Sequence, residues 1–295
     1  MKPLQIIAAP SILGLKPNGV EKLPAALRKA GLLPAIYKTK NGYTEMPDLN
    51  AGFNPERDED TLLLNGPGIA AFALRLADTL TPLYDTYFPL VLGGDCSILL
   101  GPALSLKQRG RYGLVHVDAH ADFYQPSAST LGEVADMDLA IVSGRGPAVI
   151  SDINSMSPYV PDEDIVQIGQ RDMEEAERYG SRDIRDTTIL RFDMDFIRRH
   201  SINTALQKTV AYMEQSAVQG FWIHFDADVL SDDMMPAVEY RLPGGLTQEE
   251  ATLAIRTLSQ HPKAMGMTVT IYNPLLDDDG KAGNVLTAIL NEGLA

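Results

Sequence analysis

The stretch Gly113-Leu-Val-His-Val-Asp118-Ala-His120-Ala-Asp122 decides the fold, because a mainly apolar run passes directly into carboxylates and an imidazole. Apolar runs of this kind are typical of parallel strands, which deliver side chains to the carboxyl edge of a sheet. Side chains alternate between the two faces of a strand, so Asp118, His120 and Asp122 share one parity. We therefore expect these three residues to belong to one site at a sheet edge.

Two further stretches have the same form: Pro89-Leu-Val-Leu-Gly-Gly-Asp95-Cys96 and Gly220-Phe-Trp-Ile-His-Phe-Asp226-Ala-Asp228. Asp226 and Asp228 again share a parity. Carboxylates that converge from several strands repel one another by roughly 4 kcal/mol per close pair at an effective dielectric of about 20. A cation must offset this repulsion, so the sequence predicts divalent metal at the carboxyl edge of the sheet.

Strand-like and helix-like segments alternate along the whole chain, without a linker, repeat or low-complexity tract. The alternation predicts one α/β domain over residues 1–295, with a mainly parallel, doubly wound sheet between two helical layers. The predicted strands are 4–9, 33–38, 89–93, 113–118, 165–169, 188–192, 221–226 and 264–271. The predicted helices are 20–30, 67–85, 97–109 with Ser97 as N-cap, 172–179, 196–216, 247–260 and 281–293.

The composition excludes several classes of protein. No apolar stretch approaches the roughly 18 residues that a membrane helix needs, and the N-terminus resembles a first strand more than a signal peptide. A single cysteine excludes an internal disulfide framework and fits a cytoplasmic protein. The net charge of −14 argues against nucleic acid as a partner and is compatible with a small cationic substrate.

Several motifs allow two interpretations. Cys96 is either a buried apolar side chain or a thiolate ligand at a helix N-terminus. His224 shares the parity of Asp226, but a hydrogen-bonded core histidine is the favoured interpretation. Glu174 belongs either to the first turn of a helix or to an acidic loop that faces substrate. The acidic segment 45–60 either covers the site or forms an oligomer contact.

Taken together, the motifs resemble the ureohydrolase superfamily of arginases, agmatinases and formimidoylglutamases. That family carries Gly-Gly-Asp-His-Ser, Asp-Ala-His-x-Asp and Asp-x-Asp-x-Leu-Asp-Pro stretches. They stand here as Gly93-Gly-Asp-Cys96-Ser97, Asp118-Ala-His-Ala-Asp122 and Asp226-Ala-Asp-Val-Leu-Ser231-Asp232. Further matches in order are Ile168-Gly-Gln-Arg171-Asp172, Pro243-Gly-Gly-Leu-Thr247 and Tyr272-Asn273-Pro274, so the resemblance covers nearly the whole chain.

The resemblance implies an arginase/deacetylase-like sheet and a pair of Mn²⁺ ions bridged by hydroxide. Asp118 and Asp226 would span both ions. His120 and Asp228 would complete the coordination of one ion, and Cys96 and Asp122 would complete that of the other. Asp122 would also orient the hydroxide. His120 and Asp122 are thus the expected catalytic residues, and water activated by two cations would attack the central carbon of a guanidine-like group. A homo-oligomer is expected from the family as well.

Departures from the family pattern bear on metal and substrate. Cys96 replaces the family's first metal histidine, which favours a softer metal or a single occupied position. Ile271 stands where the family has the glutamate that clamps the guanidinium, and the position of the arginase shuttle histidine falls near Ala135. Residues that read an amino acid's α-carboxylate are not apparent after Asp122, so L-arginine is not the expected substrate.

Glu239 and Tyr240 occupy a position that is small in the family, so we expect them to narrow the pocket and to bind substrate. Glu239, or less favourably Glu174, is the predicted acidic partner of a cationic substrate. The sequence therefore predicts a metal-dependent hydrolase that cleaves a C–N bond in a guanidino, amidino or formimino compound. The alternative is a catalytically silent relative that keeps the metal and acts as a binding or structural protein. A deacetylase-like amide hydrolase would need a catalytic His-His pair, which the sequence lacks.

Overall fold

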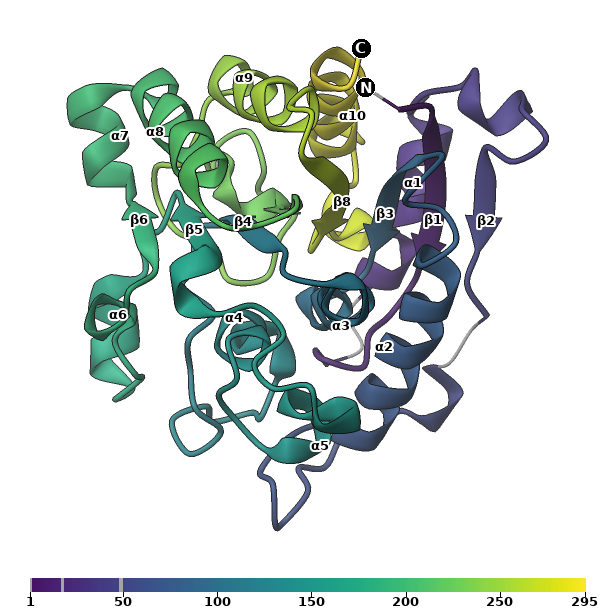
Figure 1. The fold of residues 1–295 in the computed structure, drawn as a ribbon. Coiled ribbons are helices and arrows are strands. Elements are labelled where there is room, and N and C mark those ends of the chain that lie inside the picture. Colours follow the sequence, from purple (N-terminus) through teal and green to yellow (C-terminus); the bar gives the residue numbers. More distant parts are fainter. Residues whose placement is uncertain (1, 17–18, 48–49) are drawn as a thin grey trace.

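The computed structural model describes residues 2–16, 19–47 and 50–295. Its centre is an eight-stranded sheet in the order β2-β1-β3-β8-β7-β4-β5-β6, in which every neighbouring pair is parallel (Figure 1). The strands are β1 (Leu4–Ala9), β2 (Tyr43–Glu45), β3 (Phe88–Gly93), β4 (Gly113–Val117), β5 (Ile165–Ile168), β6 (Leu190–Phe192), β7 (Phe221–Asp226) and β8 (Ala264–Thr270).

Helices cover both faces of the sheet, which gives the predicted three-layer α/β fold. The helices are α1 (Leu23–Lys29), α2 (Gly66–Leu80), α3 (Leu100–Arg109), α4 (Asp138–Val142), α5 (Ala148–Ser151), α6 (Met173–Arg178), α7 (Met194–His200), α8 (Ile202–Gln215), α9 (Gln248–Ser259) and α10 (Lys281–Gly293). Buried residues of α1 and α7–α10 pack on one face, and those of α2–α5 pack on the other. Among the described residues, no helix is long and apolar enough to cross a membrane.

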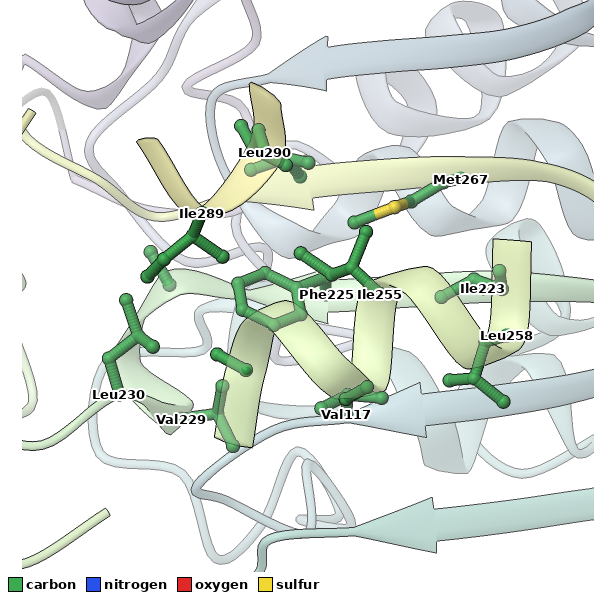
Figure 2. Close-up of a cluster of buried hydrophobic side chains, with 14 of the residues drawn as sticks. Val117, Ile223, Phe225, Val229, Leu230, Ile255, Leu258, Met267, Ile289 and Leu290 are labelled. Atoms are coloured by element: carbon green, nitrogen blue, oxygen red, sulfur yellow. The ribbon is translucent and has the colours of Figure 1, made fainter. Parts of the chain in front are cut away.

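Strands that are distant in the sequence become neighbours in the middle of the sheet, where β3, β8, β7 and β4 lie side by side. Aliphatic and aromatic side chains of these strands pack beneath α9 and α10 (Figure 2). Burial of each large apolar side chain contributes about 1.5–3 kcal/mol, so this cluster fixes the strands whose ends carry the motifs. Its members include Val117, Ile223, Phe225, Ile255, Leu258, Met267, Ile289 and Leu290.

The predicted strand at 33–38 is wrong. Residues Ile36–Lys38 form a 3-10 turn, and the edge strand is β2 instead, which pairs with β1 through Ile6 and Tyr43. Leu33 has a positive φ of 39°, a conformation that no extended strand accepts. Its backbone N–H is donated to the Asn291 side chain at 2.8 Å, which anchors the turn to α10.

Two helix predictions also need correction. Asp95, rather than Ser97, is the N-cap, because its Oδ1 accepts the Ser97 backbone N–H at 2.9 Å. A 3-10 turn at Cys96–Leu99 then leads into α3. The predicted helix 196–216 is interrupted at Ser201, whose φ of 76° ends α7 and whose side chain caps α8.

Candidate metal centre

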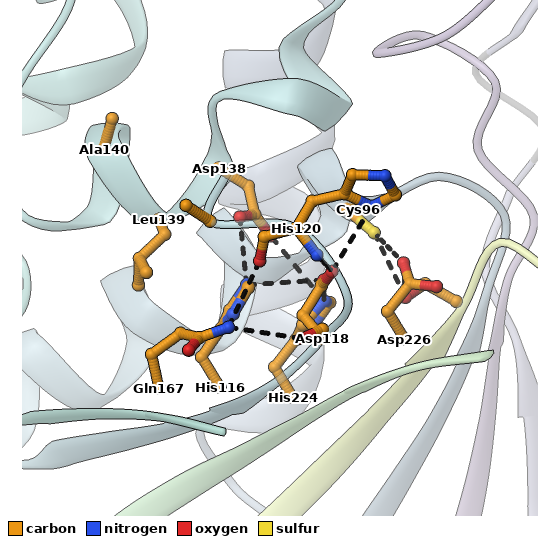
Figure 3. A network of polar contacts seen from close by, with 12 residues as sticks. Cys96, His116, Asp118, His120, Asp138, Leu139, Ala140, Gln167, His224 and Asp226 are labelled. Carbon is orange, nitrogen blue, oxygen red and sulfur yellow. Dashed lines mark hydrogen bonds and ion pairs between the residues drawn. The ribbon is translucent and has the colours of Figure 1, made fainter. Parts of the chain in front are cut away.

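The three motif stretches meet at the carboxyl ends of β3, β4 and β7 (Figure 3). Asp118 directly follows β4, Asp226 ends β7, and Cys96 begins the turn after β3. Donor atoms of Cys96, Asp118, Asp226 and His224 all lie within 4.8 Å of one another. This spacing is that of side chains that surround a shared cation.

A second group of ligand-type atoms adjoins the first. Asp118, His120 and Asp228 have donor atoms within 4.8 Å of one another, and His120 Nδ1 lies 2.9 Å from Asp228 Oδ2. Backbone groups hold these carboxylates in place: the Asp228 N–H donates to Asp226 Oδ1 at 2.9 Å, and the His120 N–H donates to Asp118 Oδ1 at 2.7 Å. The two groups share Asp118, as a bridging ligand requires.

Cys96 and Asp122 lie on the other side of this arrangement. The Cys96 thiol is buried and donates to Asp226 Oδ2 at 2.7 Å, and its sulfur lies 3.2 Å from Thr270 Oγ1. Asp122 has a φ of 46°, and its donor atoms lie within 4.8 Å of those of Cys96 and Asp138. All six predicted ligand residues therefore gather into overlapping groups.

Burial and mutual repulsion oppose ionisation of most of these carboxyls. Burial, reinforced by Asp228, raises the pKa of Asp118 to about 6. Burial and neighbouring carboxylates likewise raise the pKa values of Asp122 and Asp226 well above their usual range. Burial opposes the ionisation of Asp228 too, but His120 outweighs it and lowers the pKa of that carboxyl. Because Asp118 Oδ2 is also buried without a hydrogen-bond partner, the donor set fits divalent metal.

The Cys96 thiol is the exception among these donors. Burial, followed by the nearby Asp226, raises the pKa of this thiol well above its usual value. The thiolate is the form that binds metal strongly. As a neutral thiol bonded to Asp226, Cys96 is a weaker ligand than the other five residues.

A cavity of about 150 Å³ opens above the carboxylates. Cys96, His120, Asp122, Asp226 and Asp228 lie in its lining, and no Lys or Arg occurs among the described residues that surround it. The acidic residues of the lining are Asp122, Glu133, Asp136, Asp172, Glu175, Asp226, Asp228 and Glu239. The cavity therefore favours a cationic ligand.

The predicted substrate-binding residues fall in different places. Glu239 lines the cavity, with its Oε1 accepting from Asn273 Nδ2 at 3.0 Å. Tyr240 lines it as well and donates its hydroxyl to Glu133 Oε2 at 2.5 Å. Glu174 is exposed and is not part of the lining, whereas its neighbour Glu175 is.

Sequence reasoning missed several polar residues of this region. Asp136 and Glu133 line the cavity, and Asp138 is completely buried beside the metal ligands. Nothing local marks these residues, because the loop after Asp122 carries them back over the sheet. His116 has a detectable signal: it has the same parity as Asp118, and it pairs in register with His224 on β7.

Comparisons with known proteins agree with this geometry. The sequence model of the arginase family matches residues 2–294. The arginase of Staphylococcus aureus (strain MRSA252) is 31% identical over 281 residues, which cover 94% of this chain and 91% of that protein. The arginase of Bacillus caldovelox is 30% identical over 294 residues, which cover 98% and 97%.

Solved structures give the same result. The Bacillus cereus arginase has a TM-score of 0.83 and 28% identity, covering 99% of this chain and 98% of that one. The formimidoylglutamase of Bacillus subtilis has a TM-score of 0.73, covering 100% and 86%, and at 18% identity it shows the shared fold alone. Since the family match runs over nearly the whole chain, this protein belongs to the arginase family.

Proposed function

We propose that this arginase-family hydrolase cleaves a C–N bond in a cationic guanidino, amidino or formimino compound other than L-arginine. One observation carries the proposal: the strand-end ligand groups lie in the lining of a cavity rich in carboxylates and without a basic residue among its described members. A planar amidinium or guanidinium is best recognised by carboxylate oxygens. The α-carboxylate of an amino acid would have no cationic partner in this cavity.

Named residues of the chain would hold the metal ions. Asp118, His120 and Asp228 would bind one ion, with Mn²⁺ suited to this oxygen-rich group, and Asp226 is close enough to contribute. Cys96, Asp118 and Asp226 have donor atoms within 4.8 Å of one another and would surround the second position, with Asp122 in a neighbouring group that shares Cys96. When bound, such a pair of divalent ions makes water nucleophilic near neutral pH and polarises the scissile group.

Protein groups would handle the protons. Asp122 lies in the cavity lining beside the other ligands, where its carboxylate can orient the attacking water. Asp136 lines the same cavity, and burial raises its pKa to about 8. Asp136 therefore carries a proton at neutral pH that it can donate to the leaving nitrogen, in place of the histidine that is missing near Ala135.

The residues of the cavity wall would determine which substrate binds. Glu239 is held by Asn273 and provides the acidic partner that Ile271 cannot supply. Tyr240, through its hydrogen bond to Glu133, narrows the opening. The substrate would present its amidine group to the carboxylates below and keep an uncharged or cationic tail.

The test is an assay of metal-loaded protein against a panel of guanidino, amidino and formimino compounds, with urea, ammonia and formamide as readouts. We expect at least one cationic compound without an α-carboxylate to exceed L-arginine in kcat/KM by about 100-fold or more, that is, by about 2.7 kcal/mol of transition-state stabilisation. Asp122→Asn is the inactive control. Robust release of urea from L-arginine would contradict the specificity. Silence across the panel with metal bound would favour the catalytically silent relative.

The proposal includes homo-oligomeric assembly in the cytoplasm, which is supported by the family resemblance and by the single cysteine. Light scattering after size exclusion should give a mass of at least twice that of one chain.

A further inference from the structure

A row of buried polar side chains crosses the sheet one step behind the strand-end carboxylates. Gln167, His116, His224 and Thr268 are aligned in register on β5, β4, β7 and β8. All four are completely buried. Two imidazoles in such a place need polar partners, because an unpaired buried polar group is costly.

Asp138, the first residue of α4, lies against both imidazoles (Figure 3). Its Oδ1 is 3.3 Å from His116 Nε2, and its Oδ2 is 3.7 Å from His224 Nε2. Asp118 approaches from the other side, with its Oδ2 3.7 Å from His116 Nε2 and 3.9 Å from His224 Nε2. Two imidazole nitrogens thus face two carboxylates inside the protein.

The hydrogen bonds of His224 determine which of its nitrogens carries the proton. Thr268 Oγ1 lies 2.9 Å from His224 Nδ1 and 3.4 Å from the Ile223 carbonyl, and it accepts from Trp222 Nε1 at 3.3 Å. If the Thr268 hydroxyl donates to that carbonyl, His224 Nδ1 carries the proton. The Nδ1–H tautomer leaves a lone pair on Nε2, directed at Asp138 and Asp118. His224 Nε2, Asp138 Oδ2 and Asp118 Oδ2 are all buried without a hydrogen-bond partner. With that tautomer, three acceptors face one another, and a cation between them would satisfy all three.

We propose that a transition-metal ion binds here, held by His116 Nε2, His224 Nε2 and the carboxylates of Asp138 and Asp118. Donor atoms of His116, Asp138 and His224 lie within 4.8 Å of one another, and Asp118 Oδ2 lies 3.7 and 3.9 Å from the two Nε2 atoms. The two rings are stacked with centroids 4.8 Å apart, so binding one ion requires them to turn toward it. Ligand atoms at about 2.1 Å from a tetrahedral ion lie about 3.4 Å apart. A bond from His224 Nδ1–H to the Thr268 hydroxyl would give that ligand the support that metal-bound histidines usually have, whereas His116 Nδ1 is buried without a partner.

The identity of the donors selects the metal. Two imidazoles with two carboxylates suit Zn²⁺ or Co²⁺ better than the oxygen-rich groups above them do. This site adjoins the second position of the proposed pair and would hold that ion more firmly than Cys96 can, since the Cys96 thiol is already bonded to Asp226. The chain thus replaces a missing strand-end histidine with two histidines from the row below. The inference rests on the proposed function in one respect, namely that a neighbouring ion binds at His120 and Asp228. It does not depend on the protein being catalytically active.

The competing explanation is a proton shared within a polar network. Burial raises the pKa of Asp138 to about 7, so this carboxyl can be protonated near neutral pH. Its Oδ1 makes a hydrogen bond of 3.3 Å with His116 Nε2. Its Oδ2 is 3.7 Å from His224 Nε2, which is too long for a second one. The two explanations differ in whether the histidines bind metal.

The experiment loads chelator-treated, full-length protein with Co²⁺ and measures bound metal and the visible absorption bands of the ion. Crystals of the loaded protein, with anomalous data collected at the cobalt edge, locate the ions. We expect an ion between His116 and His224, a second beside His120 and Asp228, and the intense bands of a four-coordinate site.

Two variants and one control sharpen the test. His224→Asn keeps an N–H donor for Thr268 but removes the Nε2 ligand, and Asp138→Asn removes charge at nearly constant shape. Each should lose about one equivalent of Co²⁺ and the intense bands while circular dichroism stays unchanged. His200→Asn, on exposed α7, should bind as the parent protein does. Asp228→Asn should lose the other ion and keep the bands.

The outcomes are separable. Unchanged stoichiometry and bands in folded His224→Asn would overturn the inference and leave the proton network. If that variant does not fold, an anomalous map of the parent protein without a peak at His116 and His224 does the same. A peak at His120 and Asp228 alone would overturn the inference but leave the proposed function standing. The absence of any bound ion would contradict both.

Discussion

Cys96 lies at the mouth of β3, within 4.8 Å of Asp118 and Asp226, where the family motif has histidine. Substitution Cys96→His should raise Mn²⁺ occupancy, because imidazole suits that ion better than a neutral thiol does. The larger ring will cost about 1–3 kcal/mol of stability, since the site is fully buried. Metal analysis after equilibration with Mn²⁺ checks the occupancy. Cys96→Ser is the control without a new ligand, and equal occupancy in all three proteins would show that position 96 serves packing alone.

Glu239 is the side chain on which the proposed recognition of a cation depends. Glu239→Gln removes its charge but keeps an oxygen for the Asn273 amide. We expect KM for the cationic substrate to rise about tenfold, or about 1.4 kcal/mol, with kcat little changed, because the interaction is present in both ground and transition states. Steady-state kinetics on the best panel compound measure the effect. Glu249→Gln, on the exposed start of α9, should leave KM as it is, and an unchanged KM in Glu239→Gln would remove this residue from the cavity's recognition role.

Among structural elements, the loop 123–134 is tethered in part by Arg57, an arginine of the segment 45–60. The Arg57 guanidinium donates to the carbonyls of Leu62, Thr130 and Pro126 at 3.0, 3.1 and 2.8 Å. Thr130 lines the cavity, so these bonds hold a cavity wall in place. Of the two interpretations of the acidic segment, this contact favours the one in which it lies over the site.

Arg57→Ala should therefore loosen the loop with little effect on the core. We expect faster proteolytic cleavage within 123–134 and a KM raised by about three- to tenfold, with a change in unfolding free energy below about 1 kcal/mol. Limited proteolysis with mass spectrometry, together with steady-state kinetics, provides the check. Arg199→Ala, which removes only an exposed pair with Asp195, is the matched control. A cleavage pattern identical to that control would refute the role assigned to Arg57.

On the scale of the whole molecule, the buried carboxylates link stability to pH and to metal. The folded-state pKa values of Asp118, about 6, and Asp138, about 7, are raised chiefly by burial above the unfolded value of about 3.9. The metal-free folded state thus binds these protons more tightly than the unfolded state does. The resulting stability is complete below about pH 4 and is lost as the pH rises through 6 and 7.

We therefore expect the unfolding free energy of the metal-free protein to fall by an amount on the order of 4 kcal/mol between pH 5 and pH 8. Saturating metal should reverse most of this fall, since cation binding favours the ionised carboxylates. Urea denaturation at both pH values, with chelator or metal, gives the comparison. The unfolding free energy of metal-free Asp118→Asn should depend less steeply on pH. Equal stability of the metal-free parent protein at pH 5 and pH 8 would refute the linkage.

The local sequence determined much of this protein, because strands and their ends carry a pattern in neighbouring residues. The runs that end at Asp118 and Asp226 predicted buried parallel strands, and the structure has β4 and β7 there. Asp193 directly precedes a helical pattern, which is typical of an N-cap, and its side chain accepts the Phe196 N–H at 2.8 Å. In each case the deciding contact lies within a few residues along the chain. The edge strand was misplaced because its position depends on the packing of Leu33 against α10 rather than on local pattern.

Tertiary structure alone decided what lies around the ligands. Asp138 is 22 residues from His116 in the sequence, and only the path of the loop before α4 brings them to 3.3 Å. Parity indicated the face of His224, but its proton position depends on Thr268, a residue of β8. The acidic cavity wall combines Glu133, Asp136, Glu175 and Glu239 from separate segments. The sequence thus determined the sheet and its strand-end carboxylates, whereas the partners of those carboxylates arise from long-range packing, which leaves no periodic signal in the chain.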